Sequence, residues 1–176
     1  LYNYLGQCGL AVEPSPYFND KAPTVLLTQS SACEPDAMEK LEKYVRQGGN
    51  AVVTVGFVHE TYDKGIKDMT SVRLTHRHVL SNEFMVSNMN YLQMEVERSD
   101  DPILFEVLDY KTNATHSDIT ILAGEDNFPM MTEDNYGKGR LFILNVPENF
   151  ADLYKLPKSV VRAFNKHLSM GQRVFV

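Results

Sequence analysis

The chain has 176 residues, a hydrophobic content of 43% and a formal net charge of −6 at pH 7. This length suits one domain with a single core, and the acidic balance argues against a surface for nucleic-acid phosphates, which needs clustered lysine and arginine. No apolar run approaches the ~20 residues that cross a bilayer, and residues 1–20 do not resemble a signal peptide. We therefore expect a soluble domain, with the cytoplasm slightly favoured and with neither nucleic acid nor membrane as a partner.

The first third of the chain predicts a helix and then a strand, helix and strand in succession. Residues 1–10 carry apolar side chains at helical spacing, and residues 24–28 form an aliphatic run typical of a strand buried on both faces. Residues 34–47 predict a helix with Pro35 in its first turn, and Gly48 and Gly49 end it. A second apolar strand follows at residues 50–55. This order favours a right-handed crossover between two parallel strands.

The remainder of the chain predicts more varied elements. Residues 56–110 contain short alternating segments, at 71–75 and 92–96, which we interpret as an insertion of mixed strands and loops. Residues 119–122 and 140–145 predict strands, and residues 136–139 predict a tight turn between glycines. A closing helix is expected at 157–168, with one apolar side made of Val160, Val161, Phe164 and Leu168.

Two stretches resemble a known family. Residues 41–55 (LEKYVRQGGNAVVTV) and 136–146 (YGKGRLFILNV) are similar to the helix-Gly-Gly-strand and the late hairpin of glutamine-amidotransferase-like domains, including those attached to bacterial β-galactosidases and related carbohydrate-active proteins. The resemblance implies a flavodoxin-like α/β fold over residues 1–176, with three layers and a mostly parallel sheet covered by helices on both faces. The family's first strand is missing before residue 1, and the chain opens at Leu1. We therefore expect a fragment of a longer protein.

The catalytic motifs of that family are absent from the sequence. Active members carry a cysteine in Gly-x-Cys-x-Gly and a later His-x-Glu, whereas neither Cys8 nor Cys33 has flanking glycines of this kind. An amidase needs a thiolate beside a base. We therefore assign no catalytic residue, and we predict no cofactor.

Five polar residues are candidates for lining a cleft. His59 and Glu60 follow the second strand at its carboxyl end, where open α/β sheets commonly bind ligands. Cys33 stands at the start of a predicted helix, which can lower a thiol pKa. Asn149 and Asp152 follow the last strand and have side chains that can bond either loop backbone or a sugar hydroxyl. Structural uses of all five remain open.

His76 and His78 are candidate metal ligands. They lie two residues apart, so in a regular strand both imidazoles would face the same way. A third ligand would have to come from His59, Glu60 or His116. A solvated polar face is the plain alternative, and the sequence alone establishes no metal site.

Two functions are consistent with these patterns. The first is a non-catalytic accessory domain of a larger, carbohydrate-related bacterial protein, with the rest of that polypeptide, a second copy of the chain or a carbohydrate as partner. The second is a hydrolase-like enzyme with a metal or polar site at the carboxyl edge of the sheet. The resemblance and the missing cysteine motif favour the first.

Overall fold

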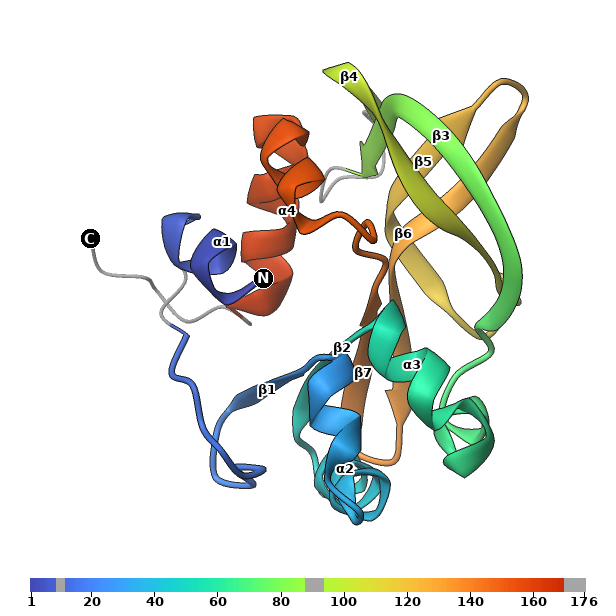
Figure 1. Cartoon of the computed structure of the whole chain (residues 1–176). Helices are drawn as coiled ribbons and strands as arrows, with labels where there is room; N and C mark the ends of the chain where they lie inside the picture. The colour runs from blue at the N-terminus through green and yellow to red at the C-terminus, as the bar shows by residue number, and fades with distance from the viewer. Residues whose placement is uncertain (9–11, 88–93, 170–176) are drawn as a thin grey trace.

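A computed structural model of the chain describes residues 1–8, 12–87 and 94–169. In these residues seven strands form one sheet in the spatial order β1-β2-β7-β6-β5-β3-β4 (Figure 1). The strands are β1 (Thr24–Leu27), β2 (Asn50–Thr54), β3 (Arg73–Ser87), β4 (Met94–Asp109), β5 (His116–Ala123), β6 (Asp126–Tyr136) and β7 (Gly139–Leu144). The helices are α1 (Tyr2–Gln7), α2 (Ala37–Arg46), α3 (Val55–Thr61) and α4 (Lys158–Leu168), with 3-10 turns η1 (Gln29–Cys33), η2 (Tyr62–Lys64), η3 (Ile66–Asp68) and η4 (Phe150–Lys155).

The sheet is mixed rather than mostly parallel. Strands β1, β2 and β7 pair in parallel, which confirms the predicted parallel pair in the first third of the chain. Strands β7, β6, β5, β3 and β4 pair in antiparallel fashion along the rest of the sheet. The predicted three-layer fold with a mostly parallel sheet is therefore wrong.

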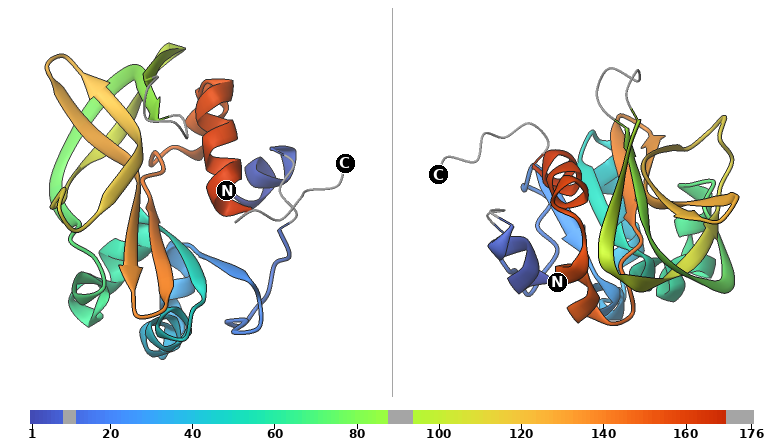
Figure 2. Two further views of the ribbon diagram at one scale, coloured as in Figure 1. Left: turned by 180° about the vertical axis from the view of Figure 1, so that it is seen from behind. Right: turned by 90° about the horizontal axis from the view of Figure 1, so that it is seen from above.

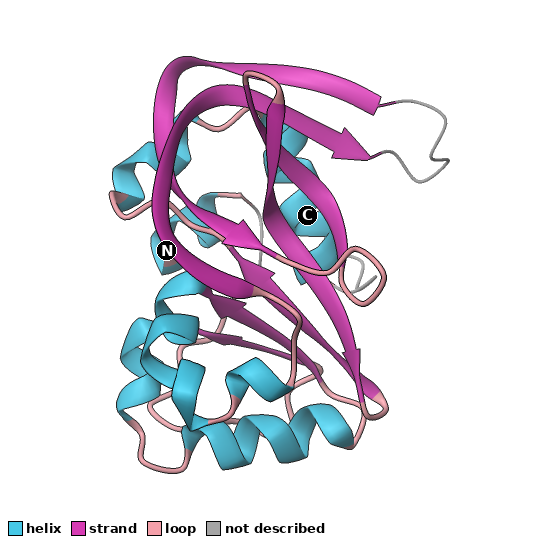
Figure 3. Cartoon of the chain, turned by 90° about the vertical axis from the view of Figure 1, so that its right-hand side faces the viewer, coloured by secondary structure: helices cyan, strands magenta, loops and turns pink. Residues whose placement is uncertain are grey.

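The long antiparallel strands explain why the sheet departs from that prediction. Strands β3 and β4 run for 15 and 16 residues, and their register shifts twice along the pair. Long antiparallel strands twist and coil, and each bulge bends them further. Figure 3 shows the resulting sheet, in magenta, as strongly curled.

Residues 56–110, which the sequence predicts as an insertion, contain α3 apart from its first residue Val55, and η2, η3, β3 and β4 in full. Both strands belong to the same sheet as the rest of the chain. Residues 92 and 93 of the expected strand at 92–96 lie outside the described residues, as do residues 9 and 10 of the expected first helix.

Two hydrophobic cores lie against the sheet. Helices α2 and α3 bury their apolar sides with residues of β1, β2 and β7 in one core. Helices α1 and α4 pack over the other core, which includes residues of β3, β4, β5 and β6. The two end helices lie side by side (Figure 2), and Asn165 Nδ2 donates to the Cys8 carbonyl at 2.6 Å. Among the described helices, none has the length and apolar character needed to span a membrane.

Candidate functional site

The candidate site begins at the carboxyl end of β2. Thr54 caps α3 there, with its side-chain oxygen accepting a bond from the Phe57 amide at 3.4 Å. Phe57 and Val58, which belong to α3, are fully buried. This anchoring turns His59 outward, and its side chain stays 34% exposed.

A bulge in β3 positions the second histidine. Leu74 pairs with Leu108 and His78 pairs with Glu106, so the three residues between Leu74 and His78 face a single residue of β4. Within the bulge, Thr75 Oγ1 donates to the Val107 carbonyl at 2.5 Å and accepts from the Arg77 amide at 3.2 Å. His76 takes a φ of 56°, a left-handed conformation that is uncommon for residues other than glycine. The bulge thereby removes His76 from the regular alternation of the strand.

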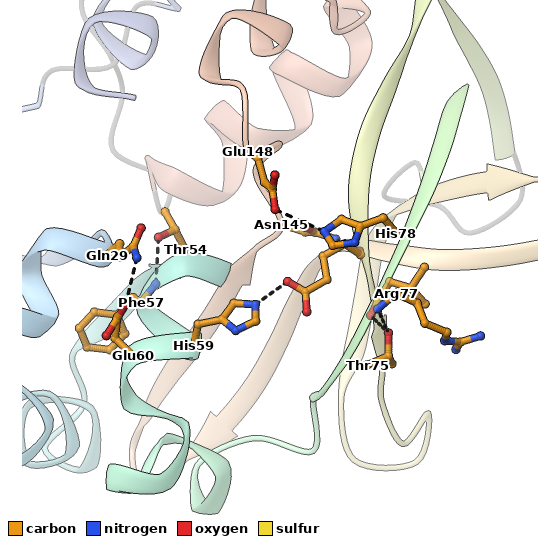
Figure 4. Close-up of polar contacts among 12 residues, drawn as sticks. Gln29, Thr54, Phe57, His59, Glu60, Thr75, Arg77, His78, Asn145 and Glu148 are labelled. Atoms are coloured by element: carbon orange, nitrogen blue, oxygen red, sulfur yellow. Dashed lines mark hydrogen bonds and ion pairs between the residues drawn. The ribbon is translucent and has the colours of Figure 1, made fainter.

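His59, His76 and Glu106 converge at this edge. His59 Nε2 lies 2.5 Å from Glu106 Oε2, a contact that Figure 4 draws as the dashed line from His59. The rings of His59 and His76 have centroids 5.6 Å apart. One possible ligand atom from each of the three residues lies within 4.8 Å of the other two. Two imidazoles and one carboxylate form a donor set typical of transition-metal sites.

Glu106 is the most buried member of the cluster. Its side chain is 9% exposed, and its Oε1 has no hydrogen-bond partner among the described residues. The fully buried Asn145, just after β7, donates from Nδ2 to the Glu106 carbonyl at 2.7 Å and so holds β4 against the end of the parallel strands. A buried carboxylate oxygen without a partner is costly, and a bound cation would remove that cost.

His78 and Glu60 have other neighbours. His78 Nε2 lies 3.4 Å from Glu148 Oε1 (Figure 4), although His78 stands opposite Glu106 in the register of β3 and β4. Glu60 Oε1 accepts a bond from Gln29 Nε2 at 3.0 Å, which directs it towards η1. The structure therefore brings His59 and His76 together but directs Glu60 away from them.

The remaining candidate residues lie in local contacts or on the surface. Asn149 caps η4 by accepting a bond from the Ala151 amide at 3.1 Å, and Asp152 pairs with Lys155 Nζ at 2.8 Å, which raises the lysine pKa. Cys33 is an exposed free thiol at the end of η1. His116 lies on β5 beside Asp118, with Nε2 and Oδ1 2.7 Å apart.

Glu106 was not among the residues predicted from the sequence. It stands alone as a charged residue within the apolar run Ile103–Leu108. Isolated charges in buried strands are uncommon unless they are paired. That signal was present in the sequence, but only the pairing of β3 with β4 connects it to the histidines.

The chain belongs to the family described as "Uncharacterized protein SSO3021, second domain", whose model matches residues 1–149. No curated protein sequence matches the chain.

Several solved structures share the fold. They include the carbohydrate deacetylase Agd3, with a TM-score of 0.57 and 7% identity over 93% of this chain and 28% of that one. A cold-adapted β-galactosidase from Rahnella sp. R3 has a TM-score of 0.56 and 16% identity over 95% of this chain and 26% of that one. The cytoplasmic protein STM3548 from Salmonella typhimurium has a TM-score of 0.55 and 11% identity over 91% of this chain and 76% of that one.

Carbohydrate-active proteins, including a β-galactosidase, are thus among the structural neighbours, as the sequence resemblance implied. The glutamine-amidotransferase-like and flavodoxin-like assignment is not supported, because the sheet is mixed and curled. The chain spans about a quarter of the β-galactosidase and of the deacetylase, at 26% and 28% of their lengths.

Proposed function

We propose that the chain is a non-catalytic accessory domain of a larger carbohydrate-related protein and that it packs against the rest of that protein. The observation that carries this proposal is the recurrence of the fold as 26% of a β-galactosidase chain and 28% of a carbohydrate deacetylase chain. The description of the matching family as a second domain supports the same role.

A packing surface is available on β3 and β4. Leu80 and Leu104 pair directly across the two strands and are 61% and 42% exposed. Ile103 and Phe105, on either side of Leu104, are buried, so Leu104 points away from their core because successive strand residues face opposite sides. An exposed apolar pair next to the open edge of a sheet is a common feature of interaction surfaces.

The double variant Leu80→Lys/Leu104→Glu tests this role, because it removes the apolar pair while placing opposite charges across the two strands. In the isolated chain, we expect the free energy of unfolding to change by no more than about 0.5 kcal/mol, because both side chains are already exposed. In the larger protein, we expect the variant domain to detach from the rest of the chain. Limited proteolysis should then cleave between the domains at least several times faster than in the wild type. Tyr17→Glu, at an exposed tyrosine outside β3 and β4, is the matched control.

Three results would contradict the proposal. The first is a gene product whose proteolysis the double variant does not change. The second is self-association of the isolated chain that the variant abolishes, which would make a second copy the partner. The third is turnover of glutamine or a glycoside by the isolated chain that is lost in Cys33→Ser.

A hydrolase-like enzyme is the second candidate function. The proximity of His59, His76 and Glu106 favours it, because three protein ligands leave a coordination position free for water or substrate. This candidate requires that the cluster bind a metal ion.

A further inference from the structure

We propose that His59, His76 and Glu106 form a binding site for one divalent transition-metal ion, with zinc preferred. This inference does not depend on the accessory role, since a metal can support either packing or chemistry. Its basis is the convergence of three possible ligands from α3, β3 and β4, which lie far apart in the sequence.

The donor set favours zinc over calcium and magnesium. Imidazole nitrogens suit zinc, copper, nickel and iron, whereas calcium and magnesium prefer oxygen ligands. Each histidine offers one nitrogen and Glu106 offers one carboxylate oxygen. Two histidines and one glutamate, with a fourth position left open, match a known class of zinc site.

The distances require only side-chain adjustment. Zinc holds nitrogen and oxygen at about 2.0–2.2 Å, which places tetrahedral ligand atoms roughly 3.3 Å apart. The ligand atoms here lie within 4.8 Å of one another, and the 2.5 Å bond from His59 to Glu106 would open as the ion enters. His59 is partly exposed and so has room to rotate.

Glu106 supplies an independent reason to expect a cation. Its side chain is nine-tenths buried, and Oε1 has no hydrogen-bond partner among the described residues even though Oε2 contacts His59. A carboxylate buried in this way is stabilised by a cation within its reach. The unusual backbone of His76 points in the same direction, since strained conformations cluster at binding sites.

Zinc titration of the purified, metal-free chain by calorimetry tests the site. We expect one ion per chain and a rise in melting temperature with zinc, because a ligand that binds the folded state stabilises it. Excess Mg²⁺ or Ca²⁺ should not compete. Visible absorption of the Co²⁺ form provides a second readout of nitrogen ligation.

Three variants identify the ligands. His59→Ala, His76→Asn and Glu106→Gln should each weaken zinc binding by at least about tenfold, since even changes next to a ligand cost this much. Asparagine at position 76 tolerates the left-handed backbone, which protects the fold. His116→Ala removes an exposed histidine outside the cluster and is the matched control.

The alternative is a simple hydrogen-bonded His59–Glu106 pair with His76 as a neighbour. No zinc binding by the folded wild-type chain would establish that alternative and overturn the proposal. Unchanged zinc affinity in His76→Asn or Glu106→Gln, or a loss of affinity confined to His116→Ala, would also overturn the proposal.

Discussion

Asp134 is a buried carboxylate on β6 that accepts side-chain hydrogen bonds at both oxygens. Thr70 Oγ1 donates to its Oδ2 at 2.6 Å, and Thr115 Oγ1 donates to its Oδ1 at 2.5 Å. Thr115 also shares a bond with Ser71 Oγ. This network attaches the segment before β3 to β5 and β6, and burial raises the pKa of Asp134 above its ordinary 3.8.

The raised pKa of Asp134 predicts how stability depends on pH. Between pH 3.8 and the higher folded-state pKa, the folded chain keeps a proton that the unfolded chain has lost. Stability from this group is therefore full below 3.8 and declines as pH rises through the folded-state pKa. Asp134→Asn removes this decline.

Urea unfolding from below pH 3.8 to neutrality measures the effect. We expect the unfolding free energy of Asp134→Asn, relative to wild type, to increase with pH across the acid range. Asp109→Asn, at an exposed carboxylate, is the control. A difference between Asp134→Asn and wild type that stays constant with pH would refute the prediction.

At the residue scale, the sequence located part of the candidate cluster. His59 is a candidate because it follows the carboxyl end of a predicted parallel strand, and His76 is a candidate because it lies two residues from His78. Their proximity could not be predicted, because the bulge that turns His76 depends on the register between β3 and β4. Glu106 required the same long-range pairing. Local patterns therefore identified two side chains but not how they meet.

At the element scale, the end of α2 packs closely against the turn between β6 and β7. The Lys138 amide donates to the Arg46 carbonyl at 3.2 Å, and the Arg140 amide donates to the Gly49 carbonyl at the same distance. Gly137, which directly precedes Lys138, has a φ of 62°. Tyr136 and Gly139 pair directly across β6 and β7, which confirms the tight turn predicted at residues 136–139.

Gly139→Ala should disrupt this contact. A Cβ at position 139 would lie 2.1 Å from the Gly49 carbonyl oxygen and 2.4 Å from that of Val45. Because both neighbours are backbone atoms, relief requires α2 to move, and we expect a loss of about 1–3 kcal/mol or more in chemical denaturation. Gly6→Ala, in α1 with open space around it, should instead stabilise by about 0.5–1 kcal/mol. Equal effects of the two changes would argue against this packing.

Short buried elements were more predictable than long exposed strands. Strands β1 and β2 and helix α2 have apolar patterns set by burial within a few residues, and all three were predicted. Strand β3 has few buried positions along its 15 residues, so its alternation is weak. Strand β3 is held in place by pairing with β4 and β5. The local sequence pattern does not contain this pairing and therefore predicts short strands separated by loops.

At the scale of the whole molecule, one sheet joins the two hydrophobic cores. On β2, Val52 belongs to the core under α1 and α4, whereas Val53 belongs to the core under α2 and α3. On β7, Phe142 and Ile143 divide in the same way. Loss of either core would therefore expose the strands that support the other.

This shared sheet predicts a single cooperative unfolding transition. Phe57→Ala and Phe164→Ala remove buried rings from opposite cores, and each should lower the unfolding free energy by about 3–5 kcal/mol. Circular dichroism and tyrosine fluorescence, which is usable because the chain has no tryptophan, should give coincident transitions in both variants. Phe150→Ala, at an exposed ring, should change the free energy by no more than about 0.5 kcal/mol. Two separate transitions in either core variant would mean that the cores unfold independently, and the sheet would then not couple them.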